Sequence, residues 1–150
     1  MVQEIVIDVD LDSLINNENI TGNICFAIDY HRYFPEQDWS DFVVIILSWW
    51  IKSFKGLIIS EIGRTYDFDF MDGSPIVMAK KISTDKAELS FYDDKSSEVH
   101  FKAVCSIKQL RDSLLSTSKK VVRAIDRENW IDEDSEELKD LVNSLEKYPL

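Results

Sequence analysis

The side chains of this sequence that could act as a nucleophile and a base are two cysteines, Cys25 and Cys105, and two histidines, His31 and His100. Nucleophilic catalysis by a thiol needs an imidazole within hydrogen-bonding reach. Cys25 and His31 fall in one expected strand, where their separation is about 20 Å, so these two cannot pair. The pairs Cys105–His31 and Cys25–His100 stay open, but no motif supports them. We therefore expect a non-enzyme with two reduced, buried thiols.

Metal and nucleotide sites have little support in the sequence. The stretch from Asp67 to Gly73 partly resembles a calcium-binding loop, but the fifth and twelfth positions, which need oxygen ligands, are Met71 and Met78. No cysteine or histidine spacing fits zinc. The glycines, at positions 22, 56, 63 and 73, are too scattered to form a phosphate-binding loop. We expect no metal and no cofactor.

The charge of the chain points to a basic protein as its partner. The net charge is −11, with 28 acidic against 17 basic residues. Such a surface repels nucleic-acid phosphates and anionic lipid and attracts basic proteins, so we expect no nucleic-acid and no membrane binding. The acidic residues expected to bind the partner come from one run near the C-terminal end: Asp132, Glu133, Asp134, Glu136 and Glu137. Asp67 and Asp69, on the outer face of an expected strand, are a second choice.

Two adjacent tryptophans, Trp49 and Trp50, leave an alternative open. Neighbouring helical residues point about 100° apart, so both are buried only if the helix is covered broadly. Either both belong to the core, or one is exposed as an interface anchor. The alternative function is a small-ligand-binding protein or an enzyme, with a pocket between helix and sheet. Such a pocket would be lined by Trp49, Trp50 and Tyr66, with His31 as its polar group.

The periodicity of apolar residues predicts one α+β domain over residues 1–150. Expected strands span 3–9, 23–32, 64–71, 74–82, 86–92 and 98–105, with polar turns at Asp72-Gly73 and at 93–97. One largely apolar helix begins near Trp39 and ends at Gly56 or Gly63. A second helix, capped by Ser106, runs to about 128, and a third covers about 134–147. The order is β-β-α-β-β-β-β-α-α, with an antiparallel sheet of about five to six strands packed against the central helix and the two C-terminal helices.

Neither a leader nor a membrane span is expected. The first residues, MVQEIVIDVD, are acidic and alternate like a strand. The most apolar segment, 42–62, carries Lys52 and Lys55 near its middle, where charge is costly in lipid. These features favour a cytoplasmic protein.

One string resembles a known kind of protein. Residues 39–50, WSDFVVIILSWW, followed by Phe70-Met71-Asp72-Gly73, are similar to a pattern in small bacterial proteins, some of them of immunity type. Proteins of that type neutralise toxins in toxin–antitoxin or contact-dependent competition systems. The resemblance covers residues 39–73, about a quarter of the chain, and implies no catalytic residue. The net charge, the small size and the lack of catalytic motifs favour an acidic inhibitor of immunity type, which would neutralise a basic partner such as a toxin with carboxylates placed where the toxin expects phosphates. The oligomeric state stays open.

Overall fold

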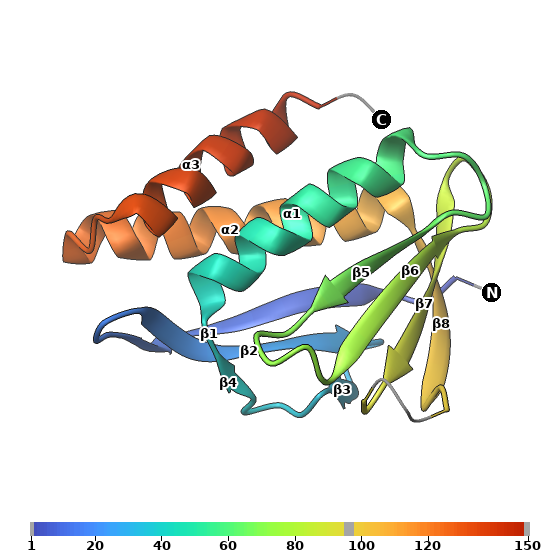
Figure 1. Ribbon diagram of the computed structural model, residues 1–150, viewed down its shortest axis with the longest axis horizontal. Coiled ribbons are helices and arrows are strands. Elements are labelled where there is room, and N and C mark those ends of the chain that lie inside the picture. Colours follow the sequence, from blue (N-terminus) through green and yellow to red (C-terminus); the bar gives the residue numbers. More distant parts are fainter. Residues whose placement is uncertain (1, 95–97, 149–150) are drawn as a thin grey trace.

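The computed structural model describes residues 2–94 and 98–148 and has an α+β fold, with three helices and two antiparallel sheets (Figure 1). The elements in chain order are β1 (Ile5–Asn16), β2 (Ile20–Ile28), β3 (Arg32–Phe34), β4 (Ser40–Asp41), α1 (Val43–Ile59), β5 (Thr65–Asp69), β6 (Ile76–Lys81), β7 (Lys86–Tyr92), β8 (Phe101–Ser106), α2 (Ile107–Glu128) and α3 (Glu133–Glu146). The expected order is confirmed, with the short strands β3 and β4 added before α1. The strands form two sheets of four instead of one sheet of five or six.

The first sheet is built on a long hairpin between β1 and β2, with β3 and β4 on the other side of β2. Most of the residues between the expected strands 3–9 and 23–32 are also part of this hairpin, which has an irregular register between Asp10 and Ile15. The second strand ends earlier than expected, at Ile28. Asp29 and Tyr30 then adopt positive φ angles of 52° and 65°, so the chain turns back into β3 without a glycine.

The second sheet has the order β5-β6-β7-β8. Its first turn contains Gly73, with a φ of +73°, as the Asp72-Gly73 pair predicts. β7 has the bounds expected from the sequence. Residues 95–97 of the expected turn 93–97 lie outside the described residues. The two sheets are joined where the N–H of Gln3, just before β1, donates to the carbonyl of Val104 in β8, at 2.7 Å.

The apolar helix α1 fills the space between the sheets and the other helices (Figure 1). It begins at Val43, after the short strand β4, and ends at Ile59, between the two glycines proposed as its end. Trp50 is fully buried, with its ring 4.8 Å from that of Phe26 in β2, whereas Trp49 keeps 37% of its surface exposed. A helix apolar on most sides is therefore a core helix, as its composition indicates.

The first of the two C-terminal helices begins at the cap that the sequence predicts. The side chain of Ser106 accepts a hydrogen bond from the N–H of Gln109 and starts α2. Asn129, with a φ of 60°, ends α2 in the left-handed conformation. α3 packs on α1 and α2 and not on the sheets (Figure 1). No helix in residues 2–94 and 98–148 is long and apolar enough to cross a membrane.

Candidate partner-binding surfaces

Several residues of the acidic run at the start of α3 form hydrogen bonds or ion pairs within the protein. Asp132 caps the helix, because its Oδ1 accepts from the N–H of Ser135 at 2.8 Å. Glu137 lies 2.6 Å from Nζ of Lys52 in α1, and Glu136 lies 3.6 Å from Nζ of Lys139. Of the five residues predicted from the sequence, three therefore have structural contacts within the fold.

The remaining two, Glu133 and Asp134, form no ion pair in the described part of the chain. Partial burial raises the pKa of Asp134, and the nearby carboxylates of Asp132, Glu137 and Glu133 raise it further. Negative charges therefore repel one another at this helix start, and a bound cation would relieve that repulsion. These five residues stay together on one surface, as the sequence predicts for neighbours in a helix.

The second predicted pair, Asp67 and Asp69, lies on β5, the edge strand of the second sheet. Asp67 is exposed and Asp69 is half-buried. Their backbone carbonyls face α1: Ser53 Oγ donates to the carbonyl of Asp67 at 2.7 Å, and Trp50 Nε1 donates to that of Asp69 at 2.8 Å. The strand edge is thus closed by side chains of a helix, and Asp67 alone of the two has a fully exposed side chain.

The four residues of the expected aromatic pocket have different surroundings. Trp50 is buried among phenylalanines, and Trp49 is partly exposed on the neighbouring helix face. The ring of Tyr66 lies so close to α1 that a Cβ atom at Gly56 would be 2.6 Å from its Cε1. His31 lies in the exposed turn after β2, where Nδ1 is 2.9 Å from the carbonyl oxygen of Asp29. The cavities described below are lined by other residues.

Neither of the two open cysteine–histidine pairs is formed in the described part of the chain. Both cysteines are free and buried, and burial raises the pKa of each thiol to about 12. His31 and His100 are both exposed, and Nδ1 of His100 is 3.6 Å from Asp93. Among the described residues no three histidine, cysteine, aspartate or glutamate side chains come together in a group that could hold a metal ion.

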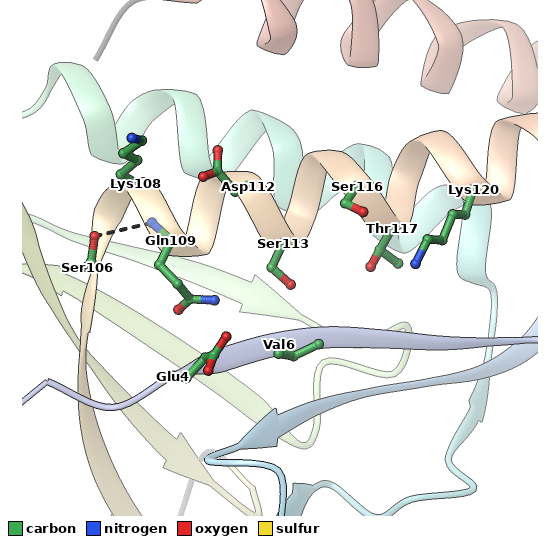
Figure 2. Close-up of a pocket in the computed structure, with 10 residues that line it drawn as sticks. All are labelled: Glu4, Val6, Ser106, Lys108, Gln109, Asp112, Ser113, Ser116, Thr117 and Lys120. Atoms are coloured by element: carbon green, nitrogen blue, oxygen red, sulfur yellow. Dashed lines mark hydrogen bonds between the residues drawn. The ribbon is translucent and has the colours of Figure 1, made fainter.

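A seam of polar side chains joins α2 to β1 (Figure 2). Gln109 exchanges two hydrogen bonds with the backbone of Ile5, accepting from its N–H at 3.0 Å and donating to its carbonyl at 2.7 Å. Ser113 accepts from the N–H of Ile7 at 2.8 Å, and Thr117 donates to its carbonyl at 2.6 Å. Because the three residues are spaced four apart, their side chains lie on one face of the helix. They form hydrogen bonds with the backbone groups along the outer edge of β1.

Along this seam runs a polar groove of about 540 Å³, lined by Glu4, Val6, Ser106, Lys108, Gln109, Asp112, Ser113, Ser116, Thr117 and Lys120 (Figure 2). It is one place between helix and sheet where the alternative function, ligand binding, could occur. Most of the groups that face β1 across it, from Gln109, Ser113 and Thr117, are already engaged by the β1 backbone. The polar side chains of the lining that make no hydrogen bond with β1, such as Lys108, Asp112 and Lys120, are the ones left to orient a ligand.

A second groove, of about 560 Å³, is more acidic. It is lined by Asp8, Val9, Asp10, Leu11, Asp12, Gln37, Asp38 and Lys120, and we call it the aspartate groove. Asp8, Asp10 and Asp12 alternate along β1 and are exposed, so their carboxylates lie on the same face of the strand, about 7 Å apart. None of the four aspartates forms an ion pair within residues 2–94 and 98–148.

The aspartate groove affects the pKa of the Cys25 thiol, because Cys25 is paired with Asp8 in the β1–β2 register. Burial is the largest cause of its raised pKa, and the charges of Asp8 and Asp38 raise it further. The sequence signal for this groove is the alternation of aspartate with apolar residues over 7–12. It was missed because the expected first strand ended at 9, and because Asp38 comes from a distant loop.

No protein-family model, curated protein or solved structure matches this chain.

Proposed function

We propose that this protein is a non-catalytic binding domain for a basic protein, most concretely an immunity-type inhibitor of a cationic toxin. The aspartate groove is the observation that supports this function best. Four carboxylates meet there with Lys120 as the one cation in the lining, and no ion pair neutralises them. Bringing lysines or arginines of a partner to this groove replaces water with charge-assisted hydrogen bonds and steers association.

Inhibition follows if the partner's basic residues normally bind an anionic substrate. Asp8 and Asp10 present negative charges at strand spacing in the regular part of the β1–β2 register, and the N–H of Asp12 donates to Oδ1 of Asp10 at 3.1 Å where that register becomes irregular. A toxin that binds phosphates with a row of cations would bind these carboxylates instead. The start of α3, with Glu133 and Asp134, is a separate acidic surface that such a partner could also bind.

The test compares two variants with the same change in net charge. Asp8→Asn/Asp10→Asn/Asp12→Asn removes the groove charges, and Asp72→Asn/Glu98→Gln/Asp140→Asn removes three charges elsewhere. The partner is first captured from a lysate of the source organism at low salt, then purified for stopped-flow association at several salt concentrations. We expect the groove variant alone to slow association by at least about tenfold and to flatten its salt dependence.

Equal rates for the two variants would show that net charge, and not the groove, governs the encounter. A third variant, Glu133→Gln/Asp134→Asn, measures how much the acidic surface at the start of α3 contributes to the association rate. Binding that is independent of salt and of all three variants would refute an electrostatic inhibitor. The proposal would also be refuted if the captured partner were acidic or neutral and its association rate were the same for the native protein and all three variants.

A further inference from the structure

The last helix, α3, lies as an outer layer over α1 and α2 (Figure 1). The chain enters it through four connecting residues, 129–132, and its buried side chains are Ser135, Leu138, Val142 and Leu145. Because α3 contributes no strand and takes no part in the contacts between α1 and the sheets, it can leave its place as one unit. Its departure would expose an apolar surface on α1 and α2, which a soluble protein keeps covered.

The surface of α1 and α2 that α3 covers has basic residues at its border, and we call it the α3 seat. Nζ of Lys52, in α1, lies 2.6 Å from Oε1 of Glu137. Lys119, in α2, forms an ion pair with Glu146. The sequence of α3, EDSEELKDLVNSLE, has six acidic residues and one basic residue. The α3 seat is therefore matched to an acidic amphipathic helix, and such a helix is the occupant that the structure shows.

The ion pairs between α2 and α3 are symmetric about the connection that joins the two helices. Nζ of Lys139 lies 2.5 Å from Oδ1 of Asp126. Together with the pair of Lys119 and Glu146, this contact shows that the helices run antiparallel, and both pairs are centred on residues 132–133 of the chain. An antiparallel pair with that centre keeps the same contacts when α3 comes from a second copy related by a two-fold axis at the connection. A second copy therefore fits the α3 seat with contacts that are already in the structure.

The connection between α2 and α3 is held closed by two local caps. Asn129 ends α2 in the left-handed conformation, with a φ of 60°, and Asp132 forms the capping box of α3. Residues 107–148 contain neither glycine nor proline, so the covalent chain allows α2 and α3 to join as one helix. Between the caps, Ile131 keeps 57% of its surface exposed and Trp130 is half-buried. In a two-fold pair these two side chains lie where the chains cross, and their copies cover them.

We propose that α3 is exchanged between two copies of this chain, each α3 occupying the α3 seat of the other copy, with residues 129–132 as the hinge. A short connection under strain favours such exchange, and the conformation of Asn129 costs a residue with a Cβ atom more than a glycine. The carboxylates of Asp132, Glu133 and Asp134 from the two copies meet at the crossing, and their repulsion favours the closed monomer in dilute protein. The exchange is independent of the function proposed above, because none of its contacts involves the aspartate groove.

Two charge-reversed variants of the full chain test the exchange directly. The body variant is Lys52→Glu/Lys119→Glu, and the helix variant is Glu137→Lys/Glu146→Lys. The four side chains keep 38–54% of their surface exposed, so both variants fold. Each variant alone places like charges between α3 and its own α3 seat, whereas exchange between the two variants places opposite charges at every one of these pairs. Both variants keep a negative net charge, so no general attraction joins them.

The variants are analysed by sedimentation, alone and after equimolar mixing, with a fluorophore at the N-terminus of the body variant. Each exposed ion pair is weak, but all four pairs of the mixed dimer are restored together. We therefore expect heterodimers in at least about tenfold excess over the statistical proportion. The inference is overturned if mixing leaves both variants monomeric. A mixture with no more heterodimer than the statistical proportion also overturns it, because the copies would then associate through another surface.

A second pair of variants changes only the hinge. Asn129→Gly favours the left-handed turn, whereas Asn129→Ala disfavours this turn and favours a continuous helix. We expect the dimer of Asn129→Ala to have a dissociation constant at least about tenfold lower than that of Asn129→Gly. Equal dissociation constants, or no dimer of Asn129→Ala at high protein concentration, contradict the exchange. A synthetic peptide of residues 130–148 is the last control. If this peptide binds the native protein while the mixed variants stay monomeric, the α3 seat opens for a foreign helix and the second copy is not its occupant.

Discussion

Removing a single hydroxyl from the seam between α2 and β1 should cost more stability than its surface position suggests. Ser113 Oγ accepts from the N–H of Ile7 at 2.8 Å, and this N–H points away from β2. In Ser113→Ala the donor keeps its half-buried position beneath α2 and loses its acceptor. Leaving a buried donor without a partner costs about 1–3 kcal/mol. Because the group is only partly buried, we expect about 1.5 kcal/mol.

The matched control is Ser116→Ala, one turn along the same helix. Ser116 is exposed and makes no hydrogen bond in the described part of the chain. Both substitutions gain up to about 0.5 kcal/mol of helix propensity, which cancels when the two variants are compared. For a chain of this length, 1 kcal/mol moves the melting temperature by about 2–4 °C. Ser113→Ala should therefore melt about 3–6 °C below Ser116→Ala.

The assay is thermal unfolding of both variants, with amide hydrogen exchange as a local readout. The amide of Ile7 should exchange faster in Ser113→Ala, and the amide of Val6, which faces β2, should keep its protection until the protein unfolds globally. Equal melting temperatures with an unchanged exchange rate at Ile7 would refute the role given to the seam. Faster exchange throughout β1 would show that α2 had detached as a whole.

Three further outcomes follow from single side chains. Lys81→Met leaves two carbonyls at the end of α1 without their donor, so its free energy of unfolding should fall by about 2–3 kcal/mol in urea titrations, while the exposed Lys80→Met changes little. Asp132→Ala removes the capping box of α3 and should lower the free energy of unfolding by about 1 kcal/mol; an unchanged midpoint would contradict the cap. The thiols of Cys25 and Cys105 have a pKa of about 12 in the fold against 9.0 in an ordinary cysteine, so their stabilisation is complete below pH 9 and is lost as pH rises towards 12. Cys105→Ala should reduce this alkaline slope of the free energy of unfolding, and an identical slope would argue against a buried thiol.

The parts of the fold that follow from local sequence were predictable. α2 begins at the cap of Ser106 and ends at Glu128, because the cap and the apolar stripe are properties of neighbouring residues. The turn at Gly73 has the same local origin. The long β1–β2 hairpin was not predicted, because its aspartates and asparagines are typical of loops. The strand can continue because the aspartates alternate with apolar residues along β1, so that the charged side chains point outward.

The candidate sites depend on contacts between distant residues and were harder to predict. The acidic run at the start of α3 was found from the sequence, but the ion pair of Glu137 with Lys52 depends on how α1 and α3 pack. The aspartate groove needs Asp38 from a loop beyond β3 beside the row on β1. Periodicity predicts which face of one element is apolar, and only tertiary structure shows which faces meet.

The seam also has a consequence for the order in which the chain is made. Ile5 and Gln109 are 104 residues apart, so the outer edge of β1 stays open during synthesis until α2 has left the ribosome. At about 5–20 residues per second, this interval lasts roughly 5–20 s. For that time the nascent hairpin presents free backbone groups to any neighbouring chain. The aspartates along β1 carry negative charge beside the open edge throughout this interval, and so they keep nascent chains apart before the helix that closes the edge exists.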